Sequence, residues 1–375
     1  MSKIKILFIH FDLGNGGAEN VLVNLLNNLD PQKYDITLRT IFSGGVNMKR
    51  LHSNIKFEPL FPIKAISGTS LLFKLLPSGW LHRLFVRGKY DYEIAFLEDI
   101  PTRILGLEKK KSSESKRYAW YHNTMDEYCF PFRVYRSEKE FYKVYSTFDK
   151  VAFVSKGALS SFKKVFNIDA KLAVVHNVCE FDNLRMRAKE DIGIKLSDGV
   201  LNMCSVGRLC GQKGFHRLIK ALGAAACNGL KKWHLYLVGD GPAKEELFSL
   251  VEEYGITDNI TFLGFQSNPQ KFVSKMDFFV CSSYKEGYST AVTESIVVGT
   301  PVLTTDCSGM AEIFGNSRCG IIVENSQKGL EDGIVQILGL NPLELCKFKA
   351  NALKRSKDFT TDQRIKEFER FISSL

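Results

Sequence analysis

The sequence lacks long hydrophobic runs and regularly spaced cysteines. No apolar segment reaches the length that a transmembrane helix needs. The first apolar stretch, residues 4–11, ends at Asp12 and is too short and wrongly flanked for a signal peptide. The nine cysteines are odd in number and include no Cys-x-x-Cys pair, so neither a disulfide framework nor a zinc site is indicated. We therefore expect a cytoplasmic protein.

The sequence also lacks a nucleic-acid-binding module, although its formal net charge is +10. Residues 1–178 hold 27 Lys and Arg against 17 Asp and Glu, whereas residues 179–375 hold 24 of each kind. The positive charge is not clustered with stacking aromatic residues, so we expect no nucleic-acid partner.

What is present is the composition of a globular protein, with 45% hydrophobic and 25% charged residues. A chain of 375 residues fits two domains of ordinary size. Short β-branched apolar runs alternate with amphipathic segments, which favours an α/β fold with parallel sheets. The predicted strands are residues 4–10, 36–41, 93–96, 117–121, 150–154 and 171–175, and then 201–206, 234–238, 260–263, 278–281, 301–304 and 320–322. This rhythm predicts two doubly wound units in series.

Domain boundaries follow from where this rhythm stops. We expect an N-terminal domain over residues 1–180, a polar linker over 181–198 and a C-terminal domain over 199–360. The last segment, 361–375, has apolar residues at helical spacing, so it should form a helix that packs back on the first domain.

A glycine-rich turn, Gly14-Asn15-Gly16-Gly17, follows the first strand and precedes a predicted helix over 18–29. Its glycines permit positive φ and close approach of a ligand. The turn lacks the third glycine of a dinucleotide fingerprint, and no acid ends the second strand to take a ribose, which disfavours a nicotinamide dehydrogenase. A plain tight turn is the alternative interpretation.

Two cations follow the first strand of the second half. Arg208 comes directly after the strand and Lys213 precedes a helix, so both should lie over the carboxyl edge of the sheet, where open α/β proteins bind ligands. A guanidinium and an ammonium together suit a pyrophosphate leaving group. The alternative is two solvated surface cations. The turn Gly239-Asp240-Gly241-Pro242 is interpreted as architectural.

Glu286 and Glu294 flank the start of a predicted helix over 290–298. They can face one cleft from opposite sides of the helix N-terminus, which attracts anions and which Ser289 or Thr290 would cap. One acid is then available for a sugar ring and the other for ribose hydroxyls. Two solvated acids on a helix face are the alternative.

His122 lies just beyond a predicted strand, where a lone histidine is more often structural than functional. The chain contains no Asp-x-Asp pair, so a Mg or Mn clamp on a diphosphate is not visible. Arg208, Lys213 and a helix dipole would have to take its place.

Taken together, these motifs resemble the family 4 retaining glycosyltransferases of GT-B fold, the group 1 type, over nearly the whole chain. The resemblance rests on Gly16-Gly17-Ala18-Glu19, Gly207-Arg208-Leu209, Lys213-Gly214, Gly239-Asp240-Gly241-Pro242, and Glu286 with Glu294. It implies two Rossmann-like domains facing across a cleft, with a nucleotide-diphosphate sugar held by the second and an acceptor by the first. No cofactor and no divalent metal are expected.

The resemblance also implies roles for individual residues. Glu286 and His122 would be the catalytic residues: Glu286 would contact the hydroxyls of the donor sugar, and His122 would lie near that sugar. The remaining roles belong to donor binding: Arg208 and Lys213 as the diphosphate clamp, Glu294 on the ribose, the backbone of Gly287, Tyr288, Ser289 and Thr290 on sugar and phosphate, Gly16 and Gly17 against the phosphate, and Phe265 near the base.

The implied reaction is transfer of a hexosyl or N-acetylhexosaminyl unit from a UDP-sugar, with retention by a front-face mechanism, in capsule or O-antigen type synthesis. Tyr288 replaces a common Phe, and Val175-His176-Asn177-Val178 replaces the usual Pro-Asn-Gly, which leaves the donor sugar open. Two other functions are considered: a nucleotide-sugar epimerase of similar fold, and a glycan- or nucleotide-binding protein without catalysis.

Residues 70–89 mix large apolar side chains with cations. Such a segment can lie on an anionic membrane surface, which suits an acceptor carried on a lipid diphosphate and predicts peripheral attachment to the inner face of the membrane. A buried amphipathic helix pair is the alternative interpretation.

Overall fold

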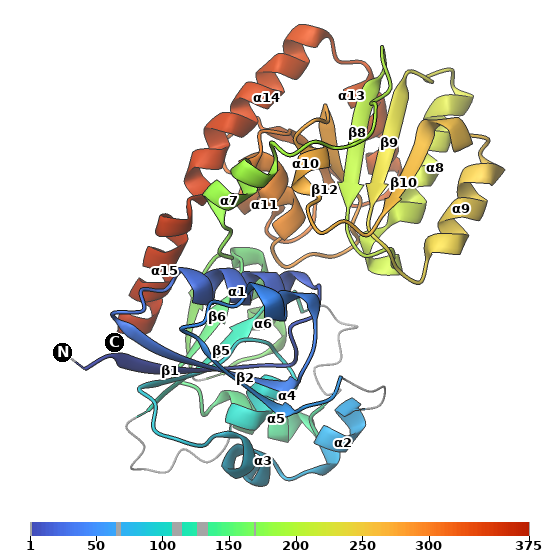
Figure 1. The fold of residues 1–375 in the computed structure, drawn as a ribbon. Coiled ribbons are helices and arrows are strands. Elements are labelled where there is room, and N and C mark those ends of the chain that lie inside the picture. Colours follow the sequence, from blue (N-terminus) through green and yellow to red (C-terminus); the bar gives the residue numbers. More distant parts are fainter. Residues whose placement is uncertain (1, 65–68, 107–114, 126–133, 169, 375) are drawn as a thin grey trace. The chain divides into compact units, whose positions relative to one another are not determined.

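The computed structural model describes residues 2–64, 69–106, 115–125, 134–168 and 170–374. The chain forms two compact units (Figure 1). Unit 1 consists of Met1–Val178 and Arg364–Leu375, and unit 2 consists of Cys179–Gln363. The chain therefore leaves unit 1 once and returns to it with the helix α15 (Thr361–Ser373).

Unit 1 contains a seven-stranded parallel sheet in the order β3-β2-β1-β4-β5-β6-β7. Residues 6–9 of β1 are fully buried, as expected for a strand that helices cover on both faces. The strands are β1 Ile4–His10, β2 Tyr34–Phe42, β3 Lys56–Phe61, β4 Tyr92–Ala95, β5 Lys116–Tyr121, β6 Lys150–Phe153 and β7 Lys171–Val174, and the helices before unit 2 are α1 Gly17–Asn28, α2 Thr69–Leu75, α3 Ser78–Phe85, α4 Ile100–Leu105, α5 Glu138–Tyr145 and α6 Lys156–Val165.

The sequence analysis missed strand β3. It pairs with β2 at the end of the sheet order, and it contains Pro59. Proline has no backbone N–H and cannot donate a ladder hydrogen bond, so within a sheet it is tolerated in edge strands. A proline therefore makes such a strand hard to predict from sequence.

Helix α15 packs on the sheet of unit 1 through its apolar stripe. The ring of Phe368 stacks on Phe8 and Trp120, with centroids 6.2 and 6.0 Å apart. The ring of Phe371 meets Trp120 and Tyr118 edge to face. These rings exclude water from one face of β1 and β5.

Unit 2 contains a six-stranded parallel sheet in the order β10-β9-β8-β11-β12-β13. Helices α8, α9 and α13 lie together on one face, and α10, α11 and α14 lie together on the other (Figure 1). The strands are β8 Leu201–Val206, β9 Trp233–Val238, β10 Ile260–Gly264, β11 Phe278–Cys281, β12 Val302–Thr305 and β13 Gly320–Val323, and the helices are α7 Phe181–Arg187, α8 Phe215–Cys227, α9 Lys244–Glu253, α10 Gln270–Val273, α11 Thr290–Val297, α12 Met310–Phe314, α13 Gln327–Leu338 and α14 Pro342–Ser356.

The polar stretch predicted as a linker is not wholly irregular. It begins with helix α7, which contacts α10 and α11 and belongs to unit 2. Leu184 is its buried apolar residue, and one such residue in a short polar helix gives too weak a pattern to predict.

Both sheets reverse their strand order next to the first strand of the unit, between β1 and β4 and between β8 and β11. Ligands of open parallel sheets bind beyond the carboxyl ends of the strands at such reversals. Among the described residues, no helix combines the length and apolar character needed to cross a bilayer.

Candidate functional site

Lys213 and Glu286 form an ion pair at the carboxyl edge of the sheet of unit 2. The Lys213 Nζ lies 2.7 Å from the Glu286 Oε1, and the Ser283 hydroxyl donates to the same oxygen over 2.6 Å. Burial lowers the pKa of the Lys213 ammonium, but the charge of Glu286 and its hydrogen bond raise it above the ordinary value overall. Lys213 is therefore protonated at neutral pH, and the two predicted residues meet at one point.

The N-terminus of α11 lies directly after Glu286 in the chain. Ser289 caps it by accepting from the Val292 amide, which decides between the two predicted caps. Gly287, Tyr288 and Ser289 are buried and Thr290 is half-buried. This helix end carries a partial positive charge and begins four residues after Glu286, the partner of the Lys213 ammonium. Both positive groups favour an anion.

Glu294 has a different partner from Glu286. The Gln270 side-chain amide donates to its Oε2 over 2.6 Å, and both residues line a cavity of about 10 Å³. The eight-residue spacing therefore directs the two acids to separate hydrogen-bonding environments.

Arg208 and Phe265 are both exposed. Arg208 makes no hydrogen bond or ion pair with the residues that the structure describes, so its guanidinium is available to a ligand. Phe265 follows strand β10 and is 53% exposed, which leaves its ring open to a flat partner such as a base.

Glycines let the loops of unit 2 approach one another. Gly239 has a φ of +143°, and a Cβ there would overlap the carbonyl oxygen of Gly207. A Cβ at Gly241 would overlap the backbone of Leu209. The Gly239-Asp240-Gly241 turn therefore supports the Gly207–Leu209 loop, which fits the architectural role predicted for it.

Sequence analysis did not predict Arg217, which supports the turn before Glu286. Arg217 on α8 is buried and donates to the carbonyl oxygens of Ser282 and Ser283, the second of which then bonds Glu286 through its side chain. Nine of the thirteen residues of α8 are buried, so periodicity does not single out this arginine.

The glycine turn of unit 1 differs from its prediction. Gly16 has a φ of −78°, and neither Gly14 nor Gly17 has a positive φ. A Cβ at Gly16 would overlap the carboxylate of Glu19, so this glycine makes room for the acid in the first turn of α1. The residue that needs positive φ is Gly45, at +108°, against the carbonyl of Leu13.

His122 lies at the carboxyl end of β5 and is half-buried. Its Nε2 lies 3.1 Å from the carbonyl oxygen of Phe96, which can only accept, so Nε2 carries the proton and Nδ1 has a lone pair. Burial, and then the charge of His10, lower the pKa of His122 to about 3. The imidazole is thus neutral at physiological pH and can accept a hydrogen bond at Nδ1.

Glu98 fixes the backbone beside this histidine and was not predicted. Its carboxylate accepts from the His122 amide over 3.0 Å and from the Asn123 side chain. Glu98 is 8% exposed, and burial raises its pKa. An acid directly after the apolar run 94–97 is a signal in the sequence from which this residue could have been predicted.

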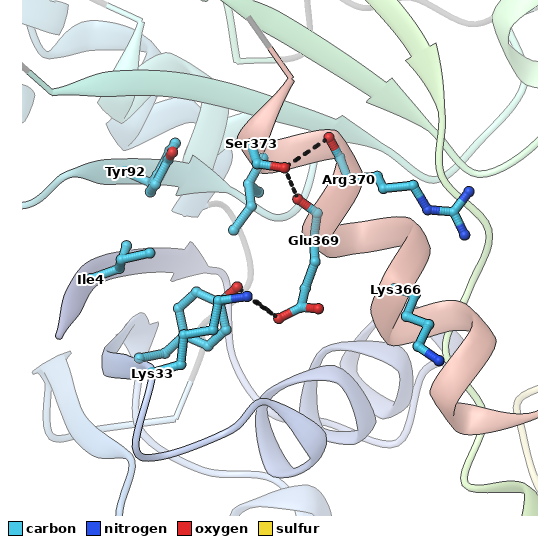
Figure 2. Close-up of a pocket in the computed structure, with 9 residues that line it drawn as sticks. Ile4, Lys33, Tyr92, Lys366, Glu369, Arg370 and Ser373 are labelled. Atoms are coloured by element: carbon cyan, nitrogen blue, oxygen red, sulfur yellow. Dashed lines mark hydrogen bonds and ion pairs between the residues drawn. The ribbon is translucent and has the colours of Figure 1, made fainter. Parts of the chain in front are cut away.

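A shallow pocket of about 330 Å³ lies elsewhere on unit 1, beside α15 (Figure 2). Figure 2 shows the Lys33 ammonium pointing at the Glu369 carboxylate, 2.7 Å away. Ile4, Tyr34 and Tyr92 line it and are the first residues of their strands, so the pocket lies at the amino edge of the sheet, away from the predicted site. No group of three or more His, Cys, Asp or Glu side chains within the described ranges is arranged to hold a metal ion.

Comparisons with known proteins give the family. The profile of the family "Glycosyl transferases group 1" matches residues 187–355. The N-acetylgalactosamine-N,N'-diacetylbacillosaminyl-diphospho-undecaprenol 4-alpha-N-acetylgalactosaminyltransferase of Campylobacter jejuni is 32% identical over 374 residues, which cover 96% of both chains. The lipopolysaccharide core biosynthesis glycosyltransferase LpsE of Rhizobium meliloti is 32% identical over 349 residues, or 89% of both.

Among solved structures, Anabaena HepE in complex with UDP and glucose has a TM-score of 0.76 and 17% identity, over 99% of this chain and all of that one. This likeness concerns the fold, and it agrees with the two parallel sheets described above. The chain belongs to the group 1 glycosyl transferases, and it has the GT-B fold.

Proposed function

We propose that this glycosyltransferase moves a hexosyl or N-acetylhexosaminyl unit from a UDP-sugar, with retention, to a glycan acceptor carried on a lipid diphosphate. The name of the Campylobacter relative describes transfer of N-acetylgalactosamine to a diphospho-undecaprenol-linked glycan. The Anabaena structure holds UDP and glucose. Synthesis of a bacterial surface polysaccharide, of capsule or O-antigen type, is the setting in which this reaction fits.

The observation that carries the proposal is the Lys213–Glu286 pair with Ser283, placed before the N-terminus of α11. A carboxylate accepts hydrogen bonds, so Glu286 suits the hydroxyls of a sugar. The ammonium and the helix end suit the adjacent diphosphate. The bond that breaks joins the sugar to the diphosphate. The pair places a carboxylate for the sugar next to a cation for the diphosphate.

In the proposed reaction, the bond between the anomeric carbon and the diphosphate oxygen breaks, and UDP departs with the electron pair. The acceptor oxygen bonds to the anomeric carbon on the same face, and its proton goes to the departing phosphate oxygen. Negative charge grows on the diphosphate, where Lys213, Arg208 and the α11 N-terminus stabilise it. No covalent enzyme intermediate is required.

Other residues bind the donor without joining the bond changes. We assign Glu294 to the ribose hydroxyls, Phe265 to the base and the backbone of residues 287–290 to the sugar and phosphate. The neutral His122 accepts a hydrogen bond from a sugar hydroxyl at Nδ1, and the Gly16-Gly17 backbone lies against the phosphate. Because fixed cations already neutralise the diphosphate, the reaction proceeds without a divalent metal.

The acceptor is presented at a membrane surface to α2 and α3 of unit 1. These helices bury Phe73, Leu81 and Phe85 but expose another set of large apolar side chains. The exposed set, named here the α2–α3 patch, consists of Leu71 (62% exposed), Leu72 (58%), Leu75 (67%) and Trp80 (60%). Arg83 on α3 and Arg87 just after it are also exposed, so this segment combines apolar and cationic groups, as do helices that lie on anionic bilayers.

The test is UDP release from a panel of UDP-sugars, in EDTA, with a lipid-diphosphate glycan as acceptor. We expect release from one donor, and a loss of about a hundredfold or more in Glu286→Gln. Glu245→Gln, at an exposed acid on α9, is the matched control and should keep wild-type activity. Loss of activity in EDTA would contradict metal independence, and an inverted anomeric product would contradict retention.

A further inference from the structure

Arg217 is a buried cation without an acidic partner in the described part of the chain. It is 2% exposed, and burial lowers its pKa. Its hydrogen bonds go to neutral oxygens: the carbonyls of Ser282 (2.6 Å) and Ser283 (2.5 Å), the hydroxyl of Thr305 (3.2 Å) and the amide oxygen of Asn325 (2.8 Å). Burying a charge without hydrogen-bond partners is costly, so the guanidinium depends on these oxygens and in turn holds the backbone that carries them.

Arg217, Thr305 and Asn325 all hydrogen-bond to one turn, residues 282–284, which follows β11. The Ser283 carbonyl also accepts from the Thr305 hydroxyl over 2.7 Å and from the Cys307 thiol over 3.1 Å. The Asn325 amide donates to the Tyr284 carbonyl over 2.9 Å. The Arg217 guanidinium lies 4.0 Å from the centre of the Tyr284 ring. The turn is therefore held along its whole length.

The turn passes this constraint to Glu286. The Ser283 hydroxyl donates to Glu286 Oε1, the oxygen that also contacts Lys213. The loop that carries Lys213 packs closely against the same turn. A Cβ at Gly214 would overlap the Ser282 carbonyl and lie 2.9 Å from the Arg217 Nε. Arg217 thus connects both members of the ion pair without touching either carboxylate oxygen.

We propose that Arg217 is a positioning residue of the donor site, which holds Glu286 in place through Ser283. The proposal rests on the proposed function, because it assumes that Glu286 contacts the donor sugar. A bidentate planar fork cannot be replaced by the point charge of a lysine. Arg217→Lys therefore separates geometry from charge.

The experiment measures kcat and KM for the UDP-sugar with saturating acceptor in Arg217→Lys, Ser283→Ala and the double variant. We expect Arg217→Lys to lower kcat about tenfold or more while KM changes less than about threefold, because positioning matters most in the transition state. The kcat of the double variant should be no lower than that of the less active single variant, since both substitutions break the same chain of contacts. Lys220→Met, at an exposed cation on α8, is the control that should leave kcat unchanged.

Thr305→Val is the milder variant if Arg217→Lys does not fold, because it removes one donor to the Ser283 carbonyl and keeps the shape. It should lower kcat several-fold. A wild-type kcat in Thr305→Val and Ser283→Ala, or a change in Tm alone in Arg217→Lys, overturns the inference.

Failure of the proposed function is recognised separately. If Glu286→Gln keeps turnover, the donor site is misassigned; if it abolishes turnover while the Arg217 variants do not, only the positioning role is lost. If wild-type protein releases no UDP, the same double-mutant cycle in thermal unfolding measures the Arg217–Ser283 link, and zero coupling there overturns the inference.

Discussion

Gly214 has a φ of +64°, a conformation that costs a residue with a Cβ about 1–2 kcal/mol. Its neighbours leave no room either, because the Ser282 carbonyl occupies the position of the Cβ. We predict that Gly214→Ala lowers the free energy of unfolding by about 2 kcal/mol or more and reduces UDP release.

Chemical denaturation measures the first effect of this substitution, and the donor assay measures the second. Gly211→Ala is the matched control three residues earlier, since nothing lies within 4 Å of a Cβ there and its φ is not positive. Equal stability of the two variants would show that the loop can move away from Ser282.

Burial strongly changes the protonation of His122. The unfolded chain protonates it at its ordinary pKa of 6.5, whereas the folded protein does so only at about 3. Acidification from pH 6.5 towards 3 therefore favours the unfolded state. We predict that His122→Gln removes part of this pH dependence, with a gain relative to wild type of up to about 1.4 kcal/mol per pH unit below 6.5.

Unfolding curves between pH 7 and pH 4.5 test this prediction, with His52→Gln, on the loop after the 3₁₀ helix Val46–Arg50, as the comparison. Nitrogen NMR of the ring should also show a neutral imidazole with its proton on Nε2 down to pH 5. A ring that becomes charged near pH 6.5 would contradict the assignment.

Among the elements, α15 packs on the sheet of unit 1 through the large rings of Phe368 and Phe371. Phe368 is 1% exposed and stacks on two rings. We predict that Phe368→Ala lowers the free energy of unfolding by about 3–5 kcal/mol, as for other buried phenylalanines. Lys366→Ala, at an exposed position on the same helix, should change it by less than about 0.5 kcal/mol. Similar values for both variants would mean that α15 contributes little to unit 1.

Sequence patterns predicted elements where the pattern was complete within a short window. Strands β1, β8 and β11 have the predicted bounds, since each is a short, mainly apolar segment that ends at a polar or glycine-rich turn. Strand β3 was missed because half of its residues are exposed and it carries Lys56, Glu58 and Pro59. The site residues divide in the same way, into those that a short sequence window reveals and those that depend on distant contacts. Lys213 and Glu286 stand out by local motif, whereas Arg217 and Gln270 matter through contacts that are 65 and 24 residues apart.

At the scale of the whole molecule, two features favour binding to an anionic membrane. They are the excess of positive charge in residues 1–178 and the α2–α3 patch. We predict co-sedimentation with vesicles that contain anionic lipid at low salt, and loss of binding as the salt concentration rises towards about 0.5 M.

A triple variant, Leu71→Ser with Leu72→Ser and Trp80→Ser, should lower vesicle binding at every salt concentration because it removes the apolar contribution. Leu343→Ser is the control, since Leu343 on α14 is 65% exposed but belongs to unit 2, which carries no excess of positive charge. Binding of the triple variant equal to that of wild type would contradict the assignment of α2 and α3 to the membrane.

The return of α15 to unit 1 sets the order in which this protein can be completed on the ribosome. Phe8, Tyr118 and Trp120 are synthesised long before Phe368 and Phe371, with all of unit 2 made in between. Until α15 emerges, these rings have no partner from that helix, and exposed aromatic surface on a nascent chain invites aggregation. The first unit to be translated is therefore the last to be finished, and unit 2 can fold while unit 1 still waits for its final helix.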